Sequence, residues 1–531
     1  MKLLYAFLLT VSVAVSLNGQ PVLLKDINPD GSSEPEYFFE YGTKTIFVAR
    51  NNTFGRELWV TDGTTAGTAL VKDIEPGSGG SDPSGLILMN GKVFFSAYTT
   101  ANGRELWVTD GTDAGTVLVK DIRPGSSSSG PTYAAVLNNK LLFNATDDIS
   151  GTELWISDGT AVGTQLLKDI EPGAADGRPE MLTTFGNQIL FRATTSTTGI
   201  ELWKTDGTSA GTTLVKDLYV GATGSYCSFF YPALGKVFFL AQTSSEGVEL
   251  WSTDGTTSGT QLIRDIRPGS PDGFVRPPNF CLNNNKLYFA ATDVSFGDEL
   301  WVTDGTTAGT ILVTDIETGA AGSQPTYLTA LNGKIYFQAY TASTGIELFA
   351  SDGTAGGTGL VKDIKPGIGN AAPMGFTAYN GKLYFIADVA SSSDWQALST
   401  DGTATNTVIV APAIAPLSSP LNTFTGFFVS NGALYYGASY TTDYYEPYIL
   451  RTNTGWNELS HETWELYPNP ASSYLTVRGV QDDANYTLTD QLGAVVQQGQ
   501  VMANQIPIRM LASGIYTLAI DGGRAKVVVQ R

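Results

Sequence analysis

The phrase Glu-Leu-Trp-x-x-Asp-Gly-Thr recurs along this chain about every 48 residues. It first spans 57–64 and next 105–112, and it weakens late in the series, at 347–354 and 396–403. A fixed period of this length means that one supersecondary unit is copied many times. Each copy is expected to bury its apolar face against its neighbours. The chain therefore has to fold as a repeat array rather than as a set of unrelated domains.

Each copy divides into four predicted strands joined by tight turns. In the second copy the strands lie at 86–89, 92–97, 105–109 and 117–122. Asn90-Gly91, between the first two, is a strong hairpin signal because both residues tolerate positive φ. The strand at 92–97 is apolar on both faces, as expected for a strand sandwiched between sheets. A four-stranded unit of this size predicts a blade of a β-propeller.

The number of copies and a lone strand at the start of the chain predict a closed ring. Nine hairpin turns run from Tyr41-Gly42 to Asn431-Gly432. The last copy lacks a fourth strand, and residues 22–27 supply one. An open ring would expose apolar faces and unpaired strand edges, so we expect that segment to pair with the last unit. The predicted fold is all-β, a β-propeller of about nine four-stranded blades over 20–457, with eight blades or an open solenoid as alternatives.

The composition limits the partners. The net charge is −20, and only 15% of the residues are charged. Nucleic acid is excluded as an expected partner, because phosphate binding needs clustered Lys and Arg. An acidic surface attracts divalent cations weakly, so we expect no cofactor beyond weak Ca²⁺ binding.

The first residues indicate export. Lys2 supplies a positive end, residues 3–15 form a mostly apolar run, and small and polar residues follow. This order predicts a secretory signal peptide at 1–19, with an N-terminal membrane anchor as the alternative. No later apolar stretch is long enough for a helix to span a membrane, so no span is expected in the mature chain.

The repeated aspartates have two interpretations. A calcium loop needs several oxygen ligands within about a dozen residues, and Asp-Gly-Thr-x-x-Gly-Thr offers one carboxylate. We therefore favour turn chemistry, in which Asp accepts backbone N–H bonds and Gly supplies positive φ. The series comprises Asp62, Asp110, Asp158, Asp206, Asp254, Asp304, Asp352 and Asp401.

The repeated tryptophans predict packing between blades, because each indole buries a large area and occupies the same place in successive copies. A glycan-stacking stripe is the alternative. The Glu before each Leu-Trp and the Lys-Asp of the fourth strand are expected to be strand-edge or inter-blade polar partners, or else a ring at a channel mouth. The tryptophans are Trp59, Trp107, Trp155, Trp203, Trp251 and Trp301.

Catalytic machinery is hard to assemble from this inventory. His461 is the single histidine, which disfavours a Ser-His-Asp triad, a His-based zinc site and a Cys-His pair. A carboxylate pair for glycoside cleavage stays open. Cys227 and Cys281 are either a disulfide, which export permits, or two buried thiols. An enzyme is therefore the less favoured reading.

A new module begins after a linker at 458–463. Residues 464–531 contain short, partly alternating strands with polar turns, which predicts a small Ig-like β-sandwich. The module resembles the C-terminal sorting domain of the type IX secretion system of Bacteroidota. The resemblance rests on Tyr467, Pro468, Asn469 and Pro470, on Gly514 and Tyr516, and on the basic and apolar end that starts at Lys526.

The repeat region likewise resembles the Glu-Leu-Trp-x-x-Asp-Gly-Thr repeat proteins of the same bacteria. The two resemblances imply passage through the periplasm, recognition by the outer-membrane secretion machinery, and a secreted or surface location. The repeat family implies no settled activity. We expect an adhesin-like binding protein whose propeller loops, such as 77–83 and 125–131, present a glycan or protein ligand site. A secreted glycoside hydrolase or polysaccharide lyase and a structural surface-layer component are the alternatives.

Overall fold

A computed structural model of the chain describes residues 21–389, 395–410, 426–438 and 444–451. In the tail it describes 465–467, 474–478, 484–489, 495–502, 505–508, 511, 514–520 and 523–529. The predicted signal peptide and linker lie outside these residues. The chain forms two compact units that divide after Arg451.

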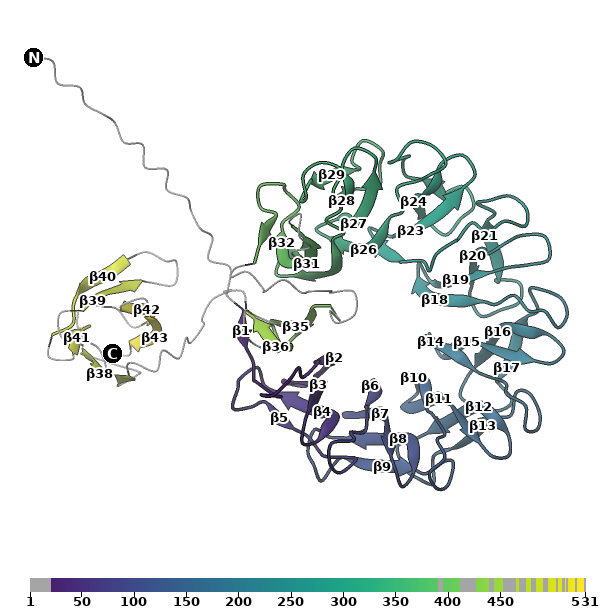
Figure 1. Cartoon of the computed structure of the whole chain (residues 1–531), viewed down its shortest axis with the longest axis horizontal. Helices are drawn as coiled ribbons and strands as arrows, with labels where there is room; N and C mark the ends of the chain where they lie inside the picture. The colour runs from purple at the N-terminus through teal and green to yellow at the C-terminus, as the bar shows by residue number, and fades with distance from the viewer. Residues whose placement is uncertain are drawn as a thin grey trace, which may run out of the picture. The chain divides into compact units, whose positions relative to one another are not determined.

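The described residues of the first unit form nine four-stranded antiparallel sheets arranged around an axis (Figure 1). In blade 2, β6 (Ser84–Met89), β7 (Lys92–Thr99), β8 (Gly103–Thr109) and β9 (Val117–Lys120) follow one another in space as in the chain. The first strand of each blade lies nearest the axis and the fourth lies outermost. The prediction of nine blades is therefore confirmed over the alternatives of eight blades and of an open solenoid.

The other blades repeat this order. Their first to fourth strands are β2 (Glu36–Tyr41), β3 (Lys44–Asn51), β4 (Gly55–Thr61) and β5 (Ala69–Leu70) in blade 1; β10 (Thr132–Leu137), β11 (Lys140–Asp147), β12 (Gly151–Ser157) and β13 (Gln165–Lys168) in blade 3; β14 (Glu180–Phe185), β15 (Gln188–Thr195), β16 (Gly199–Thr205) and β17 (Thr213–Lys216) in blade 4; β18 (Ser228–Ala233), β19 (Lys236–Ala241), β20 (Glu249–Thr253) and β21 (Gln261–Arg264) in blade 5; β22 (Cys281–Asn283), β23 (Lys286–Asp293), β24 (Gly297–Thr303) and β25 (Ile311–Leu312) in blade 6; β26 (Thr326–Leu331), β27 (Lys334–Thr341), β28 (Gly345–Ser351) and β29 (Gly359–Lys362) in blade 7; and β30 (Met374–Tyr379), β31 (Lys382–Asp388), β32 (Trp395–Thr400) and β33 (Val408–Ile409) in blade 8.

The antiparallel order gives the ring two different faces. The hairpin turn between the first and second strands and the Asp-Gly-Thr turn between the third and fourth lie on one face, the turn face. The loops that join the second strand to the third, and each blade to the next, lie on the other, the loop face. Asn90 and Gly91 have φ of 52° and 73°, as the hairpin signal predicted. In blade 1 the turn falls between β2 and β3 at Gly42 and Thr43, one residue later than predicted.

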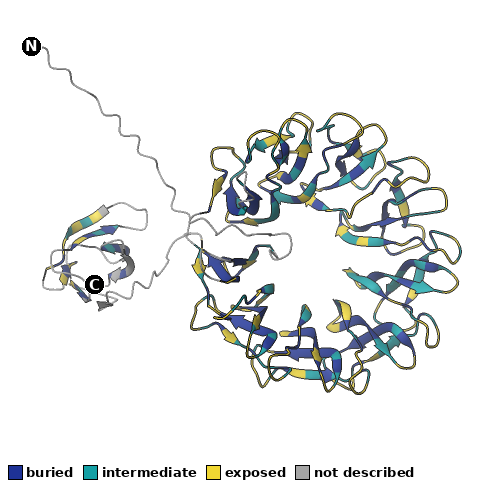
Figure 2. Cartoon of the chain, in the orientation of Figure 1, coloured by how far each residue is buried: buried dark blue, intermediate teal, exposed yellow. Residues whose placement is uncertain are grey.

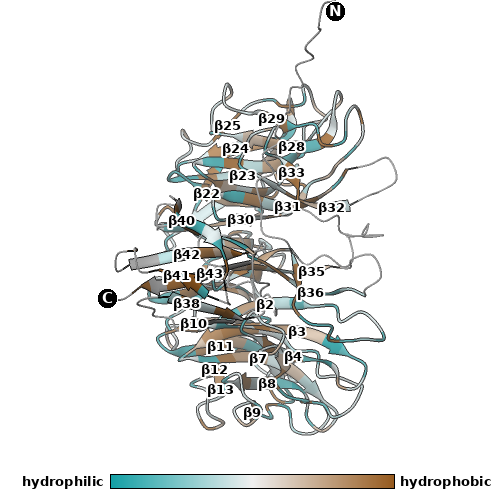
Figure 3. Ribbon diagram, turned by 90° about the vertical axis from the view of Figure 1, so that its left-hand side faces the viewer, coloured by the Kyte–Doolittle hydropathy of each residue, from teal (hydrophilic) through white to brown (hydrophobic). Residues whose placement is uncertain are grey.

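Apolar side chains join every blade to its neighbour. Between blades 2 and 3, Leu106 and Val108 pack against Leu141 and Phe143, which are fully buried. Equivalent clusters continue around the ring. The middle strands are accordingly buried, and the loops are exposed (Figure 2) and hydrophilic (Figure 3). Burying one such side chain contributes about 1.5–3 kcal/mol, so stability is distributed over all the interfaces.

The ring is closed by the start of the chain. Blade 9 consists of β34 (Phe428–Ser430), β35 (Ala433–Ala438) and β36 (Glu446–Leu450), and its fourth strand is β1 (Val22–Leu23). Val22 pairs with Ile449 and Leu23 pairs with Tyr448. Leu24 is buried in the core shared by blades 9 and 1. The predicted closure is therefore confirmed, although the regular strand is shorter than the predicted segment 22–27.

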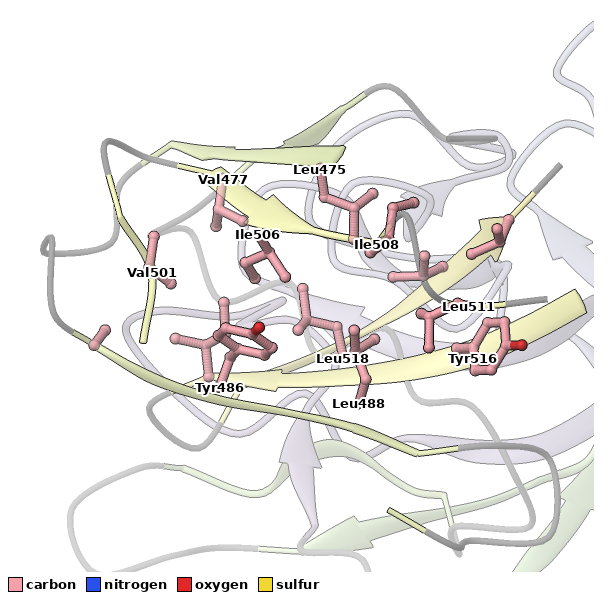
Figure 4. Packing of buried hydrophobic residues seen from close by; sticks show 14 residues of the cluster. Leu475, Val477, Tyr486, Leu488, Val501, Ile506, Ile508, Leu511, Tyr516 and Leu518 are labelled. Carbon is pink, nitrogen blue, oxygen red and sulfur yellow. The ribbon is translucent and has the colours of Figure 1, made fainter. Parts of the chain in front are cut away.

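The tail forms a small sandwich of two sheets. One contains β37 (Glu465–Tyr467), β38 (Tyr474–Arg478) and β41 (Gln505–Pro507), and the other has the order β40 (Val495–Gln500), β39 (Asn485–Thr489), β42 (Gly514–Ile520) and β43 (Gly523–Val529). Leu475 and Ile506 from the first sheet face Leu488 and Leu518 from the second (Figure 4). In the part of the chain that the structure describes, no helix has the length and apolarity needed to cross a membrane.

Candidate functional site

The tryptophan series lies between blades. Trp155 of blade 3 is 6% exposed and packs in the cluster that also contains Leu106 of blade 2. The other five tryptophans occupy the equivalent clusters. An indole held in this way has little surface left for a sugar ring, so the tryptophans offer no ligand-binding stripe.

The cations of the fourth strand cover some of these indoles. Lys120 Nζ donates to the Thr164 carbonyl of the next blade at 2.7 Å and lies 5.9 Å from the centre of the Trp155 ring. Lys216 and Arg264 contact the next blade in the same way. The cation of one blade therefore fixes the tryptophan of the next through a hydrogen bond and a cation–π contact.

The aspartate series organises the turn face. Asp158 Oδ1 accepts bonds from Thr160 N at 2.9 Å and Thr160 Oγ1 at 2.8 Å. These bonds, led by the one from the threonine hydroxyl, lower the pKa of the Asp158 carboxyl. The other seven aspartates make the same pair of contacts. Among the described residues, no three His, Cys, Asp or Glu side chains gather in a way that could hold a metal ion.

The repeated glutamates clamp the loop face. Glu57 of β4 is fully buried, and its carboxylate accepts bonds from the Ser81 backbone N–H at 2.9 Å, the Ser81 hydroxyl at 2.5 Å and the Glu75 N–H at 3.2 Å. The Ser81 carbonyl in turn accepts a bond from Tyr98 N of the next blade at 2.8 Å. One carboxylate thus fixes both ends of a loop and ties it to the neighbouring blade.

The same clamp occurs in eight blades. Its carboxylates are at most 1% exposed, so they do not line an open channel mouth as one of the sequence alternatives supposed. Burial is the main cause that raises their pKa, to about 7 for Glu57, Glu153, Glu249, Glu347 and Glu446. The remaining three clamp residues are Glu105, Glu201 and Glu299, and Gln396 occupies the position in blade 8.

The innermost strands carry a feature that the repeat phrase does not reveal. In blade 3, Thr132 pairs with Asn144 and Ala135 with Leu142, so two residues of β10 oppose one of β11. This is a β-bulge. Tyr133 within it has a φ of 52°, in the left-handed region. Bulges lie at the matching place in blades 1, 2, 4, 5, 7 and 8.

The bulge residues with positive φ form a set that we call the inner rim. Each lies five residues before the first residue of its hairpin turn, and Gly426 continues the set in blade 9. Gly85 and Gly426 have no heavy atom within 4 Å of the place where a Cβ would lie, so the position opens into free space. The inner rim comprises Tyr37, Gly85, Tyr133, Met181, Phe229, Tyr327, Gly375 and Gly426.

Four of these residues are exposed aromatics. Tyr37 is 54% exposed, Tyr133 45%, Phe229 39% and Tyr327 40%. Left-handed backbone costs a residue with a Cβ about 1–2 kcal/mol. Glycine avoids this cost in blades 2, 8 and 9. The aromatics therefore occupy positions where the left-handed backbone is strained and where the rings are exposed to solvent rather than buried.

A cavity that is open to solvent lies beside one of the four. It has a volume of about 430 Å³ and is lined by Glu36, Tyr37 and Phe38 of blade 1 and by Gly426, Phe427 and Phe428 of blade 9. Glu36 accepts a bond from Arg56 at 2.5 Å, so its charge is paired.

The two cysteines are free thiols rather than a disulfide. Cys227 and Cys281 are buried and unpaired. Burial raises the pKa of both thiols, to about 11 for Cys281, so neither is a reactive thiolate.

The tail brings together part of the predicted sorting signal. Gly514 and Tyr516 belong to β42, which pairs with β43, and Lys526 of β43 lies opposite Thr517. Tyr516 is buried in the sandwich core. Tyr467 ends β37 in the other sheet, whereas Pro468, Asn469 and Pro470 lie outside the described residues.

Comparison with known proteins identifies the tail. The family described as secretion system C-terminal sorting domain matches residues 465–531. The tail is thus a type IX sorting domain, which directs export to the cell surface or secretion and implies contact with the secretion machinery. No curated protein matches the chain.

Several solved structures are similar to the chain at low identity. PorZ, an essential surface component of the type IX secretion system of Porphyromonas gingivalis, shares 12% identity with a TM-score of 0.36, over 94% of this chain and 75% of that chain. Puromycin hydrolase shares 14% identity with a TM-score of 0.35, over 66% and 58%. The β-propeller domain of the trilobed protease from Pyrococcus furiosus shares 10% identity with a TM-score of 0.31, over 63% and 99%.

Proposed function

We propose that this exported protein is an adhesin-like binding protein that engages a ligand at the loop face of its propeller. The observation that carries the proposal is the inner rim, because exposed aromatics at strained positions contribute little to the fold. Strained backbone is concentrated at functional sites in proteins. The first strands begin on the loop face, so the aromatics lie next to the blade-to-blade loops.

The clamps support a preformed site. Loops such as 77–83 differ in sequence between blades, yet each is held at its end by a buried glutamate in eight of the blades. Binding costs less when the loops are already ordered. A rigid ring with variable loops therefore suits recognition.

The hydrolase alternative needs two accessible carboxylates with perturbed pKa values. Among the described residues that line the cavity beside Tyr37, Glu36 is the one carboxylate, and it is paired with Arg56. The carboxylates with raised pKa belong mainly to the clamps, where they are buried and hydrogen-bonded. These observations favour binding over glycoside cleavage. A surface-layer role instead predicts self-association.

The proposal is tested with the purified full chain. A glycan array and a panel of extracellular-matrix proteins would be probed, and sedimentation would be followed over a concentration series. We expect saturable binding by a monomeric ring. Absence of binding on both panels, or concentration-dependent self-assembly without ligand capture, would contradict the proposed function.

A further inference from the structure

The inner rim differs chemically from blade to blade in a way that bears on its ligand. Aromatic residues stand in blades 1, 3, 5 and 7, while blades 2, 8 and 9 have glycine and blade 4 has Met181. The aromatic residues of blades 1, 3 and 7 are thus each followed by a glycine or methionine in the next blade, while blade 6, after Phe229 of blade 5, has no member of the inner rim. We call the four exposed aromatic side chains the platforms. Flat platforms with space between them suit a ligand that is built from repeated flat units.

Polar side chains flank the aromatics. Glu36, the residue before Tyr37, pairs with Arg56 at 2.5 Å. The Thr132 hydroxyl, next to Tyr133, donates to Asn144 Oδ1 at 2.6 Å. The amide of Gln338 donates to the hydroxyl of Thr326, which precedes Tyr327. Each of these platforms therefore has hydroxyl, amide or ion-paired groups beside it that exchange hydrogen bonds.

Two arginines near the inner rim are paired with carboxylates. Arg56 lies between Glu36 and Asp82, and Arg192 pairs with Glu180, the residue before Met181. The whole chain is acidic, with a net charge of −20. A polyanionic ligand would find both arginines already paired with carboxylates, and long-range repulsion from the acidic protein would oppose it. The chemistry suits a neutral ligand with apolar faces and many hydroxyl groups.

We propose that the inner rim binds a neutral polysaccharide, whose sugar rings stack on Tyr37, Tyr133, Phe229 and Tyr327. Each pyranose ring has an apolar C–H face that packs on an aromatic ring, and its equatorial hydroxyls reach the flanking polar groups. A sugar ring stacked on Tyr37 would lie over the cavity that Glu36 lines, and its hydroxyls would meet the carboxylate of Glu36, which is bonded to Arg56. This inference rests on the proposed function and names the ligand class.

The backbone strain gives a test that separates binding from folding. A variant with glycine at all four positions (Y37G, Y133G, F229G and Y327G) removes the platforms and relieves the left-handed strain. A purely structural role predicts that this variant loses stability. A binding role predicts an unchanged or higher Tm together with lost binding, which is the trade-off expected for residues kept for function.

The experiment uses the full chain and isothermal titration with defined probes. The neutral probes are cellohexaose, mannohexaose and chitohexaose, the anionic probe is oligogalacturonate, and the peptide probe is decaproline. We expect at least one neutral oligosaccharide to bind and the four-glycine variant to weaken its binding by about tenfold or more, because all four stacking contacts are removed together. The variant Y37F/Y133F/Y327F should keep most of the affinity.

The control is Val162→Ser on the turn face, where Val162 is 91% exposed. It should leave the affinity unchanged. Binding of oligogalacturonate or decaproline alone, neutral binding that survives the four glycines, or a lower Tm without altered binding would each overturn the inference. A ring that captures a matrix protein but no glycan would retain the proposed function and reject the polysaccharide. A ring that binds nothing would reject both.

Discussion

The third strand of each blade and the first strand differ in what determines their residues. In the third strand, Glu57 and Trp59 have identical counterparts through most blades, and these are buried by the loop and by the preceding blade. At the bulge of the first strand, Tyr37, Gly85 and Met181 occupy the same place with the same unusual backbone. Close packing requires one shape at a repeated interface, whereas an exposed position is free to differ. Repetition therefore marks the scaffold here, and variation on an equally regular backbone marks the candidate binding site.

The largest expected effect concerns pH and the buried clamps. Their pKa is raised in the folded state, so between about pH 4.5 and 7 the folded chain holds more protons than the unfolded chain. Stability should be highest below about pH 4.5 as far as the clamps are concerned, and should fall as pH rises through 7, by roughly several kcal/mol in sum. Denaturant titrations between pH 4.5 and 8 measure this slope.

A single substitution sharpens that test. Glu153→Gln keeps the shape of the clamp and removes its titration, and Gln396 shows that blade 8 accommodates the amide at this position. The variant should show a shallower pH slope than the parent chain. An identical slope would mean that the clamps do not cause the pH dependence. Below about pH 4 the turn aspartates act in the opposite direction, because their lowered pKa stabilises the ring only while they are ionised.

Removing one inter-blade tryptophan should give the largest effect of any single side chain. Trp155→Ala leaves a cavity between blades 2 and 3 and is expected to lower the unfolding free energy by about 3–5 kcal/mol. Val162→Ala, at an exposed position of the same blade, should stay within about 0.5 kcal/mol. Chemical denaturation measures both. Equal effects would break the distinction between scaffold and surface.

Disrupting the ring closure should lower the unfolding free energy by less than removing an inter-blade tryptophan, but still by a measurable amount. Leu24→Ala removes a side chain that is 1% exposed and should cost about 2–4 kcal/mol. Val22→Ala, two residues earlier and 59% exposed, serves as the matched control in the same closing segment. Hydrogen exchange of β36 should increase in the first variant only. If Leu24→Ala changed neither the unfolding free energy nor the hydrogen exchange of β36, the start of the chain would not be what holds the ring closed.

A turn aspartate should contribute less to the unfolding free energy than Leu24. Asp158→Ala removes two hydrogen bonds to Thr160 in an exposed turn, and a loss of about 1 kcal/mol is expected. The decrease in Tm should not respond to added Ca²⁺, because Asp158 Oδ1 is bonded within its own turn and the described residues bring no cluster of three possible metal ligands together. A Ca²⁺-dependent rise in Tm that disappears in the variant would restore the metal interpretation.

The smallest expected effect has the opposite sign. Tyr133→Gly should raise the unfolding free energy by about 1 kcal/mol, because glycine adopts a φ of 52° without strain. Tyr340→Gly, at a similarly exposed tyrosine in β27 outside the left-handed set, should lower it by about the same amount. Thermal unfolding of both variants checks the sign. A loss of stability in both would show that the rim tyrosine supports the fold.

Much of the fold could be predicted because its signals are local or strictly periodic. The Asn-Gly hairpins, the Asp-Gly-Thr turns and the apolar second strand each lie within one repeat, and counting them indicated nine blades and a missing strand. The glutamates were predicted as strand-edge or inter-blade partners. Their actual role is to clamp a loop, as Glu57 clamps Ser81 at a distance of 24 residues and Glu446 clamps Ser33 across the ring closure, and they reach the next blade only through that loop.

The sequence by itself determined the repeat, the ring closure and the sorting tail, because turn chemistry, apolar period and a short motif act over a few residues. Tertiary structure alone decided which side chains are buried and which are exposed. Trp59 and Tyr37 are both large aromatics in predicted strands, yet a neighbouring blade covers one and leaves the other open. The bulge that exposes Tyr37 depends on how two strands pair, and its only trace in the sequence is a constant offset of five residues from the hairpin turn.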